Sequence, residues 1–131
     1  MTRAERDEFW RRFHVGIDRF REGGTDCDIA VNSFENRQWD VKFTKRRAGN
    51  RMATVSLAIL EHAPSKEQFL LAVTPTCTVD GDVTRRERFL IPVFFDDVSR
   101  TFLLQADHGP VEESRIPGFF AGIAGGLLSR L

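Results

Sequence analysis

The segment 68–107 constrains the fold most, because it holds the densest apolar, β-branched and aromatic runs of the chain. Three of these runs have the length of a β-strand, and they span 69–73, 89–95 and 101–104. The pair Asp80-Gly81 is typical of a tight hairpin turn, because glycine accepts the positive φ that such a turn requires. Residues 96–99 supply a looser turn. The segment therefore predicts antiparallel strands connected as a meander.

The run 89–95 is apolar at both alternating sets of positions, so we expect a cover on both sides of the sheet there. The candidate covers are two helices expected at the chain ends. Pro92 lies in the middle of this run and Pro75 follows the run 69–73, although proline cannot donate a hydrogen bond to a sheet ladder. We therefore expect a β-bulge near Pro92. The alternative is an edge strand beneath a helix or a dimer partner.

A helix is predicted at the N-terminus. Thr2 can cap it, the first turn is acidic, and Gly23-Gly24 ends it. Its apolar side chains fall within one arc at helical spacing, which indicates a face that packs on the sheet. These side chains are Phe9, Trp10, Phe13, Ile17 and Phe20.

Three further strands are expected between this helix and the apolar segment, at 28–34, 39–45 and 52–60. Alternation in the second directs Trp39, Val41 and Phe43 toward the core. Residues 66–73 are ambiguous, because Ser65 and Gln68 have the spacing of a helix capping box. We prefer a strand that begins at Gln68.

The C-terminal segment predicts a helix from Phe119 to the chain end, with glycines at four-residue spacing on one face. Each interior glycine costs about 1 kcal/mol relative to alanine, so the face needs a compensating role. Three explanations are open: close packing on the chain's own sheet, a homodimer interface, or an interfacial helix on a membrane. The candidate dimer residues are Gly118, Gly122 and Gly126.

The length of 131 residues indicates one α+β domain that spans 1–131. We expect an N-terminal helix, a largely antiparallel meander sheet of five or six strands, and a C-terminal glycine-rich helix packed on the sheet. The formal net charge of zero argues against a chain dominated by attraction to nucleic acid or acidic membrane. Cys27 and Cys77 have no paired spacing, and no signal peptide or membrane-length apolar run is present. We expect a cytoplasmic protein with reduced thiols.

No nucleophile elbow, phosphate-binding loop, dinucleotide fingerprint or metal-binding His or Cys pair is present in the sequence. Asp107-His108 is the best acid/base candidate, and Cys77 is the one plausible nucleophile. Nothing in the pattern brings them together. We therefore expect a protein that is not an enzyme and that carries no cofactor and no metal.

A charge asymmetry in the sheet is the more physical signal. In a meander, alternate turns lie at the same end, so two basic clusters are expected to form one rim that suits carboxylate or phosphate groups. The rim residues are Lys45, Arg46, Arg47, Arg51, Arg85, Arg86 and Arg88.

Several functions fit such a rim. We favour a small non-catalytic binding module, of the adaptor, chaperone or inhibitor kind, that recognises an acidic protein surface and forms a homodimer. The first alternative is a single-stranded nucleic-acid-binding protein, which requires solvent-exposed aromatic rings. A small enzyme, or a binder of a hydrophobic ligand in the Phe-rich interior, is a further alternative. In the simplest interpretation, the rim only keeps the hairpin tips soluble and blocks edge aggregation.

Overall fold

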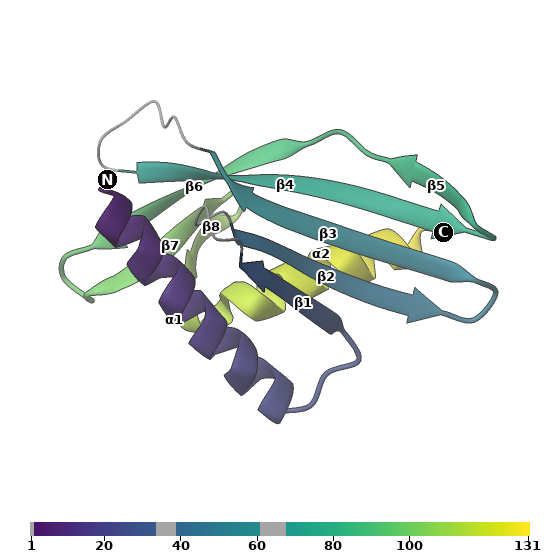
Figure 1. Cartoon of the computed structure of the whole chain (residues 1–131), viewed down its shortest axis with the longest axis horizontal. Coiled ribbons are helices and arrows are strands. Elements are labelled where there is room, and N and C mark those ends of the chain that lie inside the picture. Colours follow the sequence, from purple (N-terminus) through teal and green to yellow (C-terminus); the bar gives the residue numbers. More distant parts are fainter. Residues whose placement is uncertain (1, 34–38, 61–67) are drawn as a thin grey trace.

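The computed structural model describes residues 2–33, 39–60 and 68–131. It confirms an α+β fold with a helix at each end of the chain and an antiparallel sheet between them (Figure 1). The elements are α1 (Arg3–Glu22), β1 (Asp28–Ser33), β2 (Trp39–Arg47), β3 (Arg51–Ile59), β4 (Gln68–Val79), β5 (Asp82–Arg85), β6 (Phe89–Asp96), β7 (Thr101–Ala106), β8 (Gly109–Glu112), the 3-10 turn η1 (Glu113–Arg115) and α2 (Ile116–Ser129).

The strands follow the order β1-β2-β3-β4-β6-β7-β8, with β5 also paired to β4. Every pair is antiparallel, as the meander prediction requires. The sheet has eight strands, so the predicted count of five or six was too low. One addition is β8, which includes Pro110 at the sheet edge, where a missing N–H need not interrupt a ladder.

The predicted turns are confirmed. Only Asp80 and Gly81 separate β4 from β5, and both have positive φ, at 51° and 87°. This conformation gives the tight hairpin its twist. In the β6–β7 turn, the Asp96 carboxylate accepts hydrogen bonds from the Ser99 hydroxyl and from the backbone N–H groups of Val98 and Ser99. These bonds, the one from the hydroxyl first, lower the pKa of Asp96.

The prolines do not cause the predicted bulge. Pairing between β4 and β6 continues in register through Pro92, which lies opposite Leu70. Pairing between β6 and β7 begins one residue later, at Val93. Pro75 similarly lies where β4 changes partner from β6 to β5. Pro92 therefore coincides with a break in pairing on one side of its strand and needs no extra residue. Beside Pro75, three residues lie between Arg85 and Phe89 where β4 has two between Val73 and Thr76, so the one extra residue stands there and not at Pro92.

Both helices cover the same face of the sheet, which we call the inner face. The capping box of Thr2 and Glu5 begins α1, and the predicted apolar stripe of this helix is buried, with Phe20 at its partly buried end. The ring of Phe9 lies 5.1 Å from that of Phe69 and 5.4 Å from that of Phe102. Aromatic contacts therefore anchor α1 on β4 and β7.

Helix α2 runs along the inner face of β2 and β3 and also touches α1 (Figure 1). The ring of Phe120 lies 5.8 Å from that of Phe43 and 6.4 Å from that of Phe13. Alternation correctly predicted that Val41 and Phe43 are buried. On the neighbouring strand β3, Ala53, Val55 and Leu57 also enter the core.

The opposite face, which we call the outer face, carries neither helix. The expectation that the terminal helices cover both sides of 89–95 was therefore wrong, because both apolar helix faces enter one shared core. The strand β4 does begin at Gln68, as preferred. Residues 66 and 67, the connection 35–38 and the side chain of Trp39 lie outside the description.

Candidate functional site

The predicted basic rim is divided between the two faces of the sheet. Arg46 lies opposite Met52, and Arg85 lies opposite Thr76, which places both on the outer face. Lys45 lies opposite Ala53, a core residue, so it belongs to the inner face. The two-residue alternation of a strand separates these neighbours.

Three rim residues are engaged within the chain. The Nζ of Lys45 lies 3.4 Å from the Oδ1 of Asp26, and Arg46 pairs with Asp28. Arg47 donates to the carbonyl of Leu128 over 3.4 Å, where a cation is favourable beside the negative end of the α2 dipole. These side chains hold the edge strand and the second helix in place.

The other part of the rim is exposed. We call Arg85, Arg86 and Arg88 the basic segment. It extends from the last residue of β5 to the residue before β6, and it forms no ion pair within the described residues. Large apolar side chains lie in the same stretch: Val83 is 67% exposed, Phe89 39% and Leu90 44%. Arginine beside exposed apolar groups is a composition typical of protein interfaces.

Acidic residues also border this end of the sheet. Asp80 and Asp82 flank the glycine of the β4–β5 turn, and Glu87 lies within the basic segment. Arg51 lies opposite Val79, at the start of that turn. The rim therefore has mixed charge at the turn and a basic excess only along the basic segment.

The outer face has an unusual composition for a side of a sheet without a helix. In β3, β4 and the part of β6 that pairs with β4, none of its residues is charged. The outward residues are Met52, Thr54, Ser56, Ala58, Gln68, Leu70, Ala72, Thr74, Thr76, Thr78, Leu90, Pro92 and Phe94. Phe94 is the one aromatic residue among them, so the face does not provide a platform for stacking successive bases.

The glycine face of α2 does not pack on the sheet. A Cβ added at Gly122 or Gly126 would meet no atom within 4 Å. A Cβ at Gly118 would lie 3.6 Å from the ring of Phe20, and one at Gly125 would lie 3.2 Å from the Nζ of Lys45. Close packing thus accounts for Gly125, and the proposed dimer role of Gly118, Gly122 and Gly126 stays a prediction.

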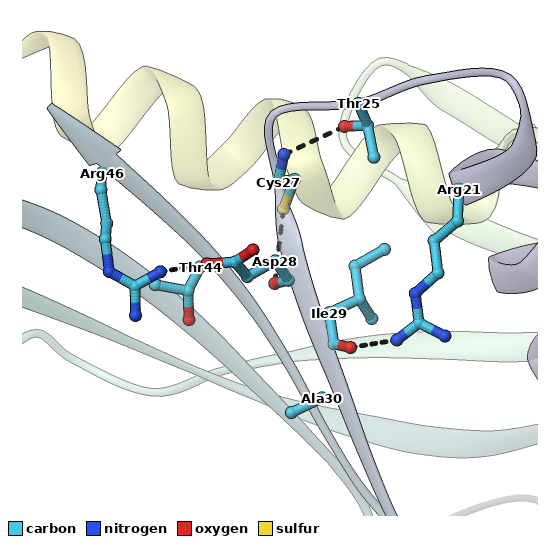
Figure 2. Close-up of a pocket in the computed structure, with 8 residues that line it drawn as sticks. All are labelled: Arg21, Thr25, Cys27, Asp28, Ile29, Ala30, Thr44 and Arg46. Carbon is cyan, nitrogen blue, oxygen red and sulfur yellow. Dashed lines mark hydrogen bonds and ion pairs between the residues drawn. The ribbon is translucent and has the colours of Figure 1, made fainter.

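A hollow of about 450 Å³ lies at the free edge of β1 (Figure 2). Arg21 extends from the end of α1 and donates to the carbonyl of Ile29, and Arg46 reaches Asp28 on the other side. The Arg21 contact uses an edge carbonyl that an added strand would need. Burial raises the pKa of the Cys27 thiol, so this sulfur is not activated as a nucleophile.

A second hollow, of about 490 Å³, lies between α1 and η1. Arg12 crosses it, donating to Glu8 at 2.9 Å, to Glu113 at 3.3 Å and to the carbonyl of Arg100 at 3.0 Å. Its guanidinium also lies over the ring of Phe102, 5.4 Å from the centroid. These contacts tie α1 to β7 and η1, and they indicate a structural role.

The candidate catalytic residues differ in their exposure to solvent and lie on different elements. Cys77 is buried on the inner face between Ala53 and Thr84, whereas Asp107 and His108 are exposed in the β7–β8 turn. No contact joins Cys77 to either of them in the described structure. Among the same residues, no group of His, Cys, Asp and Glu side chains is arranged to hold a metal ion.

Comparison with known proteins gives no match to a family model, a curated protein or a solved structure. Within residues 2–33, 39–60 and 68–131, neither helix has the length and apolar composition that a membrane crossing requires.

Proposed function

We propose that the chain is a non-catalytic protein-binding module that recognises an acidic protein surface through the basic segment. One observation supports the proposal most: Arg85, Arg86 and Arg88 are exposed and unpaired within the described residues, and they adjoin the exposed side chains of Phe89 and Leu90. An acidic partner would supply carboxylates to the planar guanidinium groups. The apolar neighbours would contribute buried area.

The structure narrows the proposed contact surface. Lys45, Arg46 and Arg47 already have partners within the chain, so reversing their charge would disturb the fold as well as any interface. A test by charge reversal is therefore better made in the basic segment than at Arg46 and Arg47. Arg51 remains at the border of this surface, beside the β4–β5 turn.

A double charge reversal, Arg85→Glu with Arg86→Glu, tests the proposal in an affinity capture from the source cell. The matched control is Arg19→Glu with Arg115→Glu, which makes the same change of net charge at two other exposed arginines. We expect the first variant to capture at least about tenfold less of the protein partner than the wild type does. The control should capture the same amount as the wild type. Both should unfold at the wild-type temperature.

Equal recovery by the two variants would contradict the role of the basic segment. Nuclease treatment separates the nucleic-acid alternative, because a partner held through nucleic acid would be lost on digestion. Its binding would also weaken steeply with added salt as counterions are released at the phosphates.

A further inference from the structure

We infer that a second copy of the chain covers the outer face, so that two sheets pack face to face in a homodimer. This inference concerns the outer face, which shares Arg85 and Leu90 with the surface proposed for the acidic partner. It is argued from other observations and does not depend on the proposed function. It also differs from the predicted glycine-face dimer, because it assigns the contact to the sheet.

The composition of the outer face is the first reason. An antiparallel sheet with one solvated side normally alternates apolar and polar residues. Here the outward row across the middle of the sheet reads Ala58, Ala72 and Leu90. The next rows add further apolar residues, which are Leu70, Pro92, Phe94 and Leu103. We call these seven residues the outer patch.

The absence of a cover within the described chain is the second reason. Both helices direct their apolar residues to the inner face, where they share one core with the strands. On the outward side of α2, a Cβ at Gly122 or Gly126 would meet no atom within 4 Å. Among the described elements, no helix is left to shield the outer patch. Ala58 and Leu90 are exposed, Ala72 is buried among its neighbours, and the other four residues are half-buried. An apolar patch without a cover marks an interaction site.

The available area is the third reason. Strands lie about 4.8 Å apart and rise about 3.3 Å per residue. The strands β2, β3, β4, β6 and β7 average about nine residues and therefore present roughly 24 Å by 30 Å, or about 700 Å² per copy. The outer patch occupies four of them, and Lys42 and Arg46 on the outer face of β2 form a charged rim beside it. Two such faces would bury ~1,400 Å², which lies in the usual range for specific interfaces. Packed sheets of this kind lie about 10 Å apart and exclude water between them.

Charge placement favours a self-complementary pair. Arg85 lies on the outer face at the end of β5, opposite Thr76. Asp96 lies on the same face at the opposite end of the sheet, where β6 ends beyond Phe94. A two-fold axis across the strands reverses their direction in the second copy. It thereby brings the Arg85 end of each face over the Asp96 end of the other.

The test is the mass of the full chain in solution, measured by light scattering and by sedimentation equilibrium over a range of micromolar concentrations. We expect the wild type to be a dimer. The double variant Ala58→Lys with Leu90→Lys places like charges on both facing sheets, and both positions are exposed in the single chain. It should weaken association by about 100-fold or more. Gly122→Lys on α2 and Val98→Lys in the β6–β7 turn should leave the dimer intact.

A cysteine variant tests the surface without adding charge. Ala58→Cys should react more slowly with a maleimide as protein concentration rises, whereas Val98→Cys should react at a constant rate; the native Cys27 and Cys77 are both buried. A wild-type chain that stays monomeric throughout would overturn the inference. So would a dimer that survives Ala58→Lys with Leu90→Lys and dissociates in Gly122→Lys, since that result would place the contact on the glycine face.

Discussion

Leu70 and Leu71 are neighbours in β4, yet they meet different surroundings. Leu71 is fully buried on the inner face beneath the helices, whereas Leu70 lies on the outer face opposite Pro92. Strand geometry alone directs them to opposite sides. The two sides then diverge because both helices cover one of them. The same apolar sequence therefore contributes a core on one side and, on the other, the face that we infer to be covered by a second copy.

Alanine substitution of these two leucines should give the largest difference. Leu71→Ala leaves a cavity in a closed core and should lower the free energy of unfolding by about 2–5 kcal/mol. Leu70→Ala removes a half-buried side chain and should cost about 1 kcal/mol in the monomer. Urea unfolding at low protein concentration, followed by circular dichroism, measures both values.

Protein concentration sharpens this comparison. If a second copy covers the outer face, the cost of Leu70→Ala grows with concentration, because association stabilises the wild type by mass action. The cost of Leu71→Ala per chain should change less. Equal costs for the two leucines at low concentration would mean that the outer face is already covered within one chain.

Local patterns predicted much of the inner layer. Helical spacing found Phe9, Phe13 and Ile17, and period-two alternation found Val41 and Phe43, because these signals depend only on neighbours in sequence. The side on which each helix packs depends on contacts between distant segments. For that reason the sequence did not exclude helices on both faces, and it gave no indication of the short edge strand β8.

The candidate site was less predictable than the core. Basic residues could be located from the sequence, but their partners could not. Arg47 contacts the carbonyl of Leu128, far along the chain, and Arg46 pairs with Asp28 on the neighbouring strand. Arg46 is exposed as well, but it has an ion-pair partner, whereas the exposed arginines of the basic segment have none within the described residues. The outer patch had one signal in the sequence, which was the apolar character of 89–95 on both faces.

Helix α2 also has one buried side and one open side. Its inward residues, such as Phe120 and Ala124, are fully buried, whereas Gly122 faces open space. Gly122→Ala should raise the free energy of unfolding by about 0.5–1 kcal/mol, because alanine favours the helix and meets no neighbour. Gly125→Ala should gain less, since its Cβ would press on Lys45. Thermal unfolding of both variants measures the change in stability. A lower stability of Gly122→Ala would indicate a close partner on the glycine face.

The attachment of α1 to the inner face includes a surface network that should respond to pH. The Glu8 carboxylate accepts hydrogen bonds from Arg11 and Arg12, and these bonds lower the pKa of Glu8 from 4.5 to about 2. Arg12 extends the network to Glu113 and Arg100. Because the carboxylate is at the surface, we expect its effect to be the smallest of those considered.

The sign of this pH effect follows from linkage. A carboxyl group whose pKa is lowered in the folded state stabilises the fold above its unfolded pKa, and it loses that contribution as the pH falls toward the folded value. Wild type should therefore be more stable than Glu8→Gln at neutral pH, and the difference should shrink as the pH falls from 4.5 to about 2. Urea unfolding at a series of pH values measures it. The difference should be small at every pH when Arg11 and Arg12 are both replaced by Gln, because the charged partners of Glu8 are then absent. A pH-dependent difference that persists in that background would assign the effect to another part of α1.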